Sequence, residues 1–230
     1  MLFRSWRSGL PQGEELESSG LEKLRIWAAY LDPQGSHTKH VARLALNLFD
    51  GLASAGLPGP YRDLRNRMLL HAAALMHNVG HTAGHKGHHK QSYRLIHALR
   101  PPIGWSNDEF EVSALVARYH RGSWPRAQHP GFAKLPPIRR ETVLHLGGIL
   151  RLAVAFEHNQ KHTVRTLRVQ VQGEALQIWA EGYRQTSENA RILAAERHLL
   201  ERALRMPVLI RSRPEGPRQM HLEESKSHVA

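Results

Sequence analysis

The chain has 230 residues, which is enough to bury a full core and form one large domain. It contains no cysteine, and this excludes disulfides, thiolate zinc sites and cysteine nucleophiles. Its 32 basic and 20 acidic residues leave a net charge of +12, an excess that attracts polyanions such as nucleic acid, polyphosphate or nucleotides. The basic residues are spread along the chain rather than run together, so a solvated basic surface is the alternative.

The sequence predicts neither a membrane-spanning segment nor a secretory signal. No apolar run approaches the roughly twenty residues that a bilayer-spanning helix needs. Residues 1–15 contain two arginines but lack the apolar core of a secretory signal. We therefore expect a cytoplasmic protein with no membrane partner.

The first half of the chain predicts a loose or docked arm followed by helices. Residues 1–17 show no periodicity and form the expected arm. Apolar residues at helical spacing predict helices at about 20–31, 36–52 and 64–78, of which the second begins at Ser36 as its cap. A further helix starts near His88, and a capping box at residues 106–109 starts another that runs to about His120.

The second half of the chain predicts helices and a small β element. Residues 122–137 are rich in glycine and proline and form a long loop able to overhang a site, before a helix at 138–158. The period then changes to two over residues 167–180, which predicts a β-hairpin. A helix at 183–205 and a last strand at 207–210 follow, and the tail at 211–230 lacks apolar periodicity and is predicted to be disordered.

Residues 69–99 organise the rest of the chain. Seven of the seventeen histidines lie between His71 and His97 inclusive, around the end of an apolar helix at His77 and Asn78. Glycines between residues 80 and 87 interrupt the helix before the next one begins. Histidines gathered at helix ends are suited to a metal site.

Five motifs in this order resemble the HD superfamily of metal-dependent phosphohydrolases. They are residues 37–46 (HTKHVARLAL), 74–80 (ALMHNVG), 87–93 (GHHKQSY), 117–121 (ARYHR) and 149–154 (ILRLAV). Within that superfamily the chain is most similar to the C-terminal domain of the exopolyphosphatase and guanosine pentaphosphatase (Ppx/GppA) family, over residues 21–210. The resemblance implies a mainly α fold. We expect a single HD-like helical domain at 18–210 with a small C-terminal β-hairpin appendage, at about 163–181 and 207–210.

The resemblance also implies a set of site residues. It assigns His77 and Asn78 as the catalytic doublet, and His37, His77, His88 and His120 as metal ligands. It implies a divalent transition metal, with zinc, nickel, cobalt or manganese as candidates. Structural hydrogen-bonding histidines that remain from an ancestral site are the alternative, and His81, His85 and His97 are expected to be solvated.

Two carboxylates of the superfamily pattern are missing from this sequence. The doublet reads His-Asn because Asn78 replaces the aspartate, and Val154 stands where the last aspartate belongs. Neutral imidazoles alone favour zinc, nickel, cobalt or copper over magnesium or manganese. Glu157, one helical turn beyond Val154, is the nearest acid in sequence that could compensate.

Basic residues beside these positions are candidates for phosphate binding. Lys90 and Arg121 are the predicted phosphate-binding residues, and Arg118 and Arg151 could line the same cleft. Arginine suits phosphate oxygens because its guanidinium binds them in bidentate geometry. For Lys90 a solvated basic face is the competing interpretation.

These observations support two main hypotheses of function. The first is a phosphohydrolase-like protein acting on or binding phosphorylated anions such as polyphosphate or guanosine polyphosphates. The second is a non-catalytic module with a decayed metal site that binds a polyanion or a protein partner. The resemblance implies that the main phosphatase chemistry of the family lies in N-terminal actin-like domains with phosphate-binding loops. This sequence contains no such loop. Nucleic-acid binding rests on net charge alone, because basic residues interleaved with aromatics are absent, so we expect no nucleic-acid partner.

Overall fold

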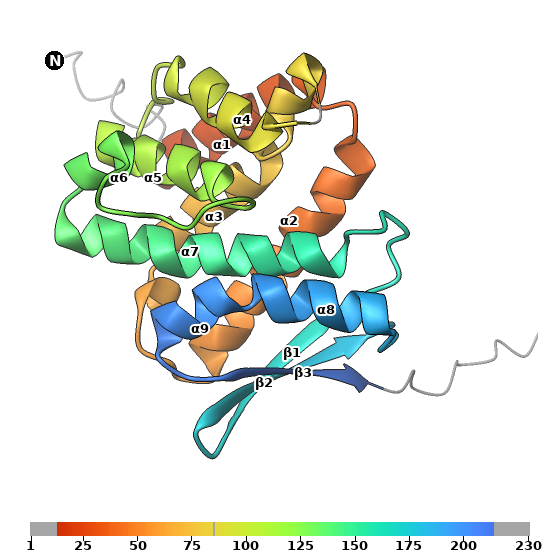
Figure 1. Cartoon of the computed structure of the whole chain (residues 1–230). Coiled ribbons are helices and arrows are strands. Elements are labelled where there is room, and N and C mark those ends of the chain that lie inside the picture. Colours follow the sequence, from red (N-terminus) through yellow and green to blue (C-terminus); the bar gives the residue numbers. More distant parts are fainter. Residues whose placement is uncertain (1–12, 85, 214–230) are drawn as a thin grey trace, which may run out of the picture.

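The computed structural model describes residues 13–84 and 86–213, and the fold is mainly helical with a small sheet near its C-terminal end, as predicted (Figure 1). The α-helices are α1 (Gly13–Leu31), α2 (Gly35–Ser54), α3 (Leu64–Met76), α4 (His88–His97), α5 (Asn107–Arg118), α6 (Pro130–Lys134), α7 (Pro137–Phe156), α8 (Ser187–Glu196) and α9 (His198–Leu204). Two 3₁₀-helices, η2 (Pro60–Arg62) and η3 (Val79–Ala83), and three strands, β1 (Leu167–Gln172), β2 (Ala175–Glu181) and β3 (Val208–Arg213), complete the described chain.

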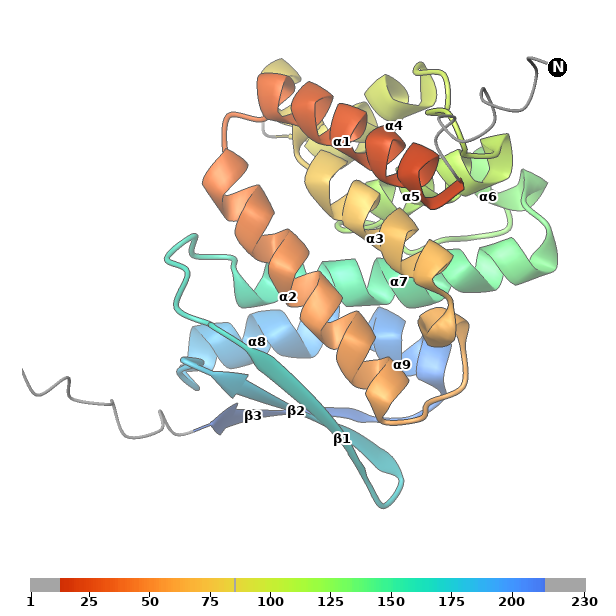
Figure 2. The same cartoon turned by 180° about the vertical axis from the view of Figure 1, so that it is seen from behind.

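Helix α7 is the centre of the fold. It crosses the molecule between a layer of helices that includes α3 and α5 and a second layer made by α8, α9 and the sheet (Figures 1 and 2). Its residues are buried on nearly every side, which is why its sequence carries apolar residues and glycines rather than one apolar stripe. At Gly148 an added Cβ would lie 2.8 Å from the Cα of Leu200, so glycine at this position allows α9 to pack directly on α7.

Helix α3 is covered by α1, α2 and α5. Its C-terminal half is buried from Ala72 to Met76, and the chain that follows it remains buried through His77 and Asn78. Asp63 caps its start by accepting a hydrogen bond from the backbone N–H of Arg65. The helix end therefore brings polar residues into the middle of the apolar core.

The predicted hairpin is confirmed and belongs to a three-stranded sheet. Strands β1 and β2 pair antiparallel, with Leu167 opposite Ala180. Strand β3 pairs parallel with β2, with Leu176 opposite Val208. The sheet packs on α2, where Gly51 makes room for Val169 because an added Cβ would lie 2.6 Å from a Val169 methyl group (Figure 2).

Four boundaries differ from the prediction. Helix α1 begins at Gly13, inside the expected arm, and residues 1–12 lie outside the described chain. Gln34 rather than Ser36 is the N-cap of α2, and it caps through no side-chain hydrogen bond. The single helix expected at 183–205 is divided at Arg197 into α8 and α9, which lets α9 turn onto α7.

The fourth difference concerns the last strand. It continues past residue 210 to Arg213, because its last three residues pair with Trp179, Ala180 and Glu181 of β2. Residues 214–230, the rest of the tail predicted to be disordered, lie outside the described chain. Among the described helices, none combines the length and the apolar character that crossing a bilayer requires.

Candidate functional site

Two histidines end neighbouring helices in the same way. His77 follows the last residue of α3, and its Nδ1 lies 2.7 Å from the carbonyl oxygen of Ala74. His120 lies two residues beyond α5, and its Nδ1 lies 2.6 Å from the carbonyl oxygen of Ala117. A carbonyl oxygen can only accept, so Nδ1 carries the proton in both rings and each Nε2 presents a lone pair. A backbone carbonyl that fixes the tautomer in this way is the usual second partner of a metal-binding histidine.

The fold brings the four histidines predicted as metal ligands into one cluster. The ring centroids of His77 and His120 lie 4.9 Å apart, and those of His37 and His77 lie 5.9 Å apart. The Nε2 atoms of His88 and His120 are separated by 3.1 Å. These histidines come from α2, the end of α3, the start of α4 and the end of α5, so the cluster depends on the tertiary fold.

Ser92 positions α4 against the chain that follows His77. Its hydroxyl donates to the backbone carbonyl of His77 at 2.7 Å and accepts from the backbone N–H of Gly80 at 2.9 Å. Gly80 is required at this contact, because an added Cβ would lie 2.3 Å from the carbonyl oxygen of His88. These contacts fix the distance between His77 and the start of α4.

Two more histidines join the cluster. His81 stacks on His88 with ring centroids 3.9 Å apart, so the expectation that His81 is solvated is wrong. The ring centroids of His89 and His120 lie 6.3 Å apart, a contact that the sequence pattern did not predict. His97 is exposed, as expected, and its Nδ1 lies 2.8 Å from a carboxylate oxygen of Glu111. His85 lies outside the described residues.

Burial keeps four histidines of the cluster uncharged. Desolvation lowers the pKa of His77 to about 3 and moves the pKa of His120 well below its ordinary value. The pKa of His37 is lowered for the same reason, and desolvation lowers the pKa of His89 to about 4. At neutral pH these imidazoles are therefore neutral, which suits metal ligands and not cations that attract a phosphate.

The cluster borders a cavity of about 430 Å³, which we call the histidine cavity. Four of the predicted site residues, His37, Asn78, His88 and His120, line it together with the exposed Arg121, whereas His77 is fully buried and is not among the lining residues. Lys90 is exposed on α4 and is not part of the lining. The lining residues are Gln34, His37, Asn78, His81, His88, His120, Arg121, Arg151, Val154, Ala155, His158, Gln160, Ile192 and Glu196.

The two arginines of the lining differ in their contacts. Arg151 is 5% exposed, forms an ion pair with Glu196, and donates to the carbonyl oxygen of Gly122 at 2.6 Å. It is therefore engaged in joining α7 to α8 and to the chain after α5. Arg121 is exposed at the cavity, which leaves its guanidinium accessible to a ligand. Residues 122–137 were predicted to form a long loop able to overhang the site, but part of this segment folds as α6 and none of its residues lines the cavity.

Glu157 does not replace the missing carboxylates. It is fully buried, accepts a hydrogen bond from the backbone N–H of His162 at 2.8 Å, and lies 3.3 Å from Nε2 of His40. It is absent from the lining of the histidine cavity, where Asn78 and Val154 occupy the positions of the two lost acids. The amide of Asn78 is 3.4 Å from the side-chain oxygens of Gln34 and Thr38.

The donor chemistry of the cluster fits a transition metal better than magnesium. Among the described residues, neither the buried Nε2 of His77 nor the buried Nδ1 of His37 has a hydrogen-bond partner. Orphaned acceptors of this kind are costly unless a donor or a cation reaches them. Over the described chain, however, no three histidine or carboxylate side chains are arranged to hold an ion as they stand.

Comparison with known proteins identifies the family. The family model described as Ppx/GppA phosphatase, domain III matches residues 30–213, which is most of the chain and contains the whole histidine cluster. No curated protein matches the sequence. The chain therefore belongs to the Ppx/GppA phosphatase family, through its domain III.

Proposed function

We propose that the histidine cavity binds phosphorylated anions of the polyphosphate or guanosine polyphosphate class, together with a divalent transition metal. The observation that carries this proposal is the fixed acceptor nitrogen of His120 on the wall of a cavity that exposes Arg121, with the like nitrogen of the buried His77 on the neighbouring ring. The family membership supports the ligand class. The ordered motifs that resemble the HD superfamily support a common scaffold.

His77, His88 and His120 would hold the metal, with His37 beside them. When bound, such a metal neutralises phosphate oxygens and acidifies a water molecule. Arg121 binds a further phosphate oxygen, which arginine does with two parallel hydrogen bonds. The carbonyl oxygens of Ala74 and Ala117 fix the tautomers of His77 and His120, which leaves the Nε2 lone pairs of both rings for the metal. Ser92 holds α4, the helix that begins with His88, in place.

A non-catalytic binding module is the second candidate, and one observation favours it. Proton transfer from an attacking water needs a base, and the cavity positions that would supply a carboxylate hold Asn78 and Val154. The carboxylate that does line the cavity, Glu196, is held in its ion pair with Arg151. In this candidate the cavity binds the anion without turnover, either as a free polyanion or as part of a protein partner.

Affinity for inorganic tripolyphosphate tests the proposal. We expect Arg121→Ala to weaken binding by about tenfold, which corresponds to about 1.4 kcal/mol. Lys90→Ala removes an equal charge from a neighbouring position outside the lining and serves as the matched control, with unchanged affinity. Equal losses in the two variants would mean that net charge, rather than the cavity, binds the anion.

Hydrolysis separates the two candidates. Release of phosphate by the wild-type chain in the presence of zinc, and its loss in His120→Ala, would identify a phosphohydrolase. Tight tripolyphosphate binding without release would identify the binding module.

A further inference from the structure

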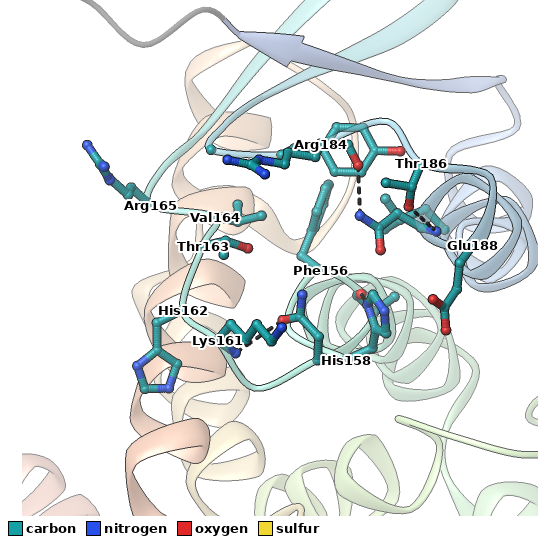
Figure 3. A pocket seen from close by; sticks show the side chains of 16 residues that line it. Phe156, His158, Lys161, His162, Thr163, Val164, Arg165, Arg184, Thr186 and Glu188 are labelled. Atoms are coloured by element: carbon teal, nitrogen blue, oxygen red, sulfur yellow. Dashed lines mark hydrogen bonds between the residues drawn. The ribbon is translucent and has the colours of Figure 1, made fainter.

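A second pocket lies beside the histidine cavity, between residues 155–165 and 182–193 (Figure 3). Its volume is about 570 Å³, and we call it the basic pocket. Its lining includes buried apolar side chains, and the rings of Phe156 and Tyr183 pack edge to face with centroids 6.2 Å apart. Polar and charged side chains make up the rest of the lining.

Cationic side chains outnumber acidic ones in the lining of the basic pocket. Lys161, Arg165 and Arg184 line it, Glu188 is the acidic residue of its lining, and Arg165 lies 3.9 Å from the carboxylate of Glu181. In the part of the chain that the structure describes, no carboxylate forms an ion pair with Lys161 or with Arg184. Cationic side chains without a protein counter-ion around one pocket favour an anionic ligand.

The first wall of the basic pocket is held in a fixed shape. His162 has a positive φ of 52°, an uncommon conformation that its backbone N–H stabilises by donating to the buried Glu157 at 2.8 Å. The two walls meet at Gly182, where an added Cβ would lie 1.9 Å from the carbonyl oxygen of Thr163. Glycine at this position therefore lets the walls close at one end.

The second wall is held by the start of α8. Thr186 caps that helix by accepting from the backbone N–H of Asn189, and the Asn189 amide donates to the carbonyl oxygen of Arg184 at 2.7 Å. Figure 3 shows both interactions on one side of the pocket, with Lys161 and His158 on the other. The cations thus stand on opposite walls, as expected of a site that surrounds its ligand.

The two pockets share part of their lining. Ala155 and His158 line both the histidine cavity and the basic pocket, so the pockets lie on either side of the end of α7. A long chain of phosphates that passes from one pocket to the other would run past these two shared residues, whereas a ligand as short as tripolyphosphate would occupy the histidine cavity alone.

We propose that the basic pocket is a second phosphoanion site that extends the histidine cavity, so that one long-chain polyphosphate ligand occupies both. The proposal rests on the proposed function for the first of its two sites. What it adds to that function is that Lys161 and Arg184 bind those phosphates of the ligand that lie remote from the histidines.

Titrations of the full chain with inorganic tripolyphosphate, long-chain polyphosphate and GTP test this. The double variant Lys161→Ala/Arg184→Ala should lose about tenfold in affinity for long-chain polyphosphate and keep the wild-type affinity for tripolyphosphate. The control Lys23→Ala/Arg202→Ala removes two exposed charges elsewhere and should change neither. GTP carries as many phosphates as tripolyphosphate, so a matching loss with GTP would show that the basic pocket binds the nucleoside part and would contradict a second phosphate site. A loss confined to long-chain polyphosphate would support it.

Wild-type affinity for long-chain polyphosphate in the double variant, or an equal loss in the control, would overturn the second site. Failure of the proposed function gives a different result. In that case Arg121→Ala leaves tripolyphosphate binding unchanged, while Lys161→Ala/Arg184→Ala still weakens the binding of the long chain.

Discussion

The Nε2 atoms of His88 and His120 lie 3.1 Å apart, inside the core of the molecule. Two nitrogens that share one zinc ion, each at about 2.0–2.1 Å, are separated by about 2.9 to 3.4 Å. The same distance suits a hydrogen bond in which one neutral imidazole donates to the other. A metal ion could therefore replace the proton of this hydrogen bond between the two Nε2 atoms with little movement of either ring.

Loss of a cluster histidine should abolish tight metal binding. We expect the wild-type chain to bind about one zinc ion and His120→Ala to bind it at least tenfold more weakly, because a ligand with a fixed tautomer is removed. Calorimetric titration of tag-free protein measures this. His97→Ala, which alters an exposed histidine, is the control and should bind zinc as the wild type does. Unchanged zinc affinity in His120→Ala would show that the cluster is not the metal site.

Restoring a carboxylate should strengthen the site. Asn78→Asp adds a negative charge at the cavity wall and should raise zinc affinity by about tenfold or more, since the neutral imidazoles leave the charge of the ion uncompensated. Combined with Val154→Asp, it should also produce or raise metal-dependent release of phosphate from tripolyphosphate. The same titration and a phosphate-release assay measure the two effects.

Asn78→Leu is the control for a change of side chain without charge. A double variant that folds but binds zinc no better than the wild type would contradict the assignment of these two positions.

Adjacent glycines in α7 should respond oppositely to alanine. Gly148→Ala should lower the free energy of unfolding by about 2 kcal/mol or more, because the new Cβ meets the backbone of Leu200 at 2.8 Å. Gly147→Ala should leave stability unchanged or raise it by about 1 kcal/mol, because its nearest neighbours lie at 3.7 Å and beyond and alanine favours the helix. Urea unfolding measures both. Equal effects would contradict the direct packing of α9 on α7.

The helix α5 cap should make stability depend on pH. The hydrogen bond from the Arg65 guanidinium, 2.8 Å long, lowers the pKa of Glu109 from 4.5 to about 2. A lowered carboxyl pKa stabilises the fold above the unfolded value, and this contribution disappears as the pH falls from about 4.5 through about 2. Glu109→Gln should therefore cost about 2 kcal/mol at neutral pH and flatten the pH dependence of unfolding in that window.

The control for this prediction is Glu22→Gln. Glu22 forms an exposed pair with Arg25 on α1, so its loss should change stability little at any pH. An identical pH profile for wild type and Glu109→Gln would contradict the role given to Arg65.

Much of the fold could be predicted from local patterns. The capping box at Ser106 and Glu109 is complete in the structure, and α5 starts where it predicts. The change of period from helical to alternating predicted β1 and β2, because a half-buried strand turns every second side chain inward. The five motifs, in their order, were sufficient to predict that four histidines from separate helices lie close together.

The remaining features depend on contacts between distant residues, which local patterns do not contain. The stacking of His81 on His88 arises from the way η3 lies against α4. The pairing of Arg151 with Glu196 joins residues of α7 and α8, and it determines which arginine stays accessible. The basic pocket likewise combines a loop and a helix start that are separated by the whole hairpin.

Titration of tripolyphosphate into the full chain, with and without zinc, tests the central claim most directly. We predict binding that zinc strengthens, that Arg121→Ala weakens by about tenfold, and that loses its zinc dependence in His120→Ala. Tripolyphosphate binding that is indifferent to zinc and to both substitutions would contradict the assignment of the histidine cavity as the phosphoanion site.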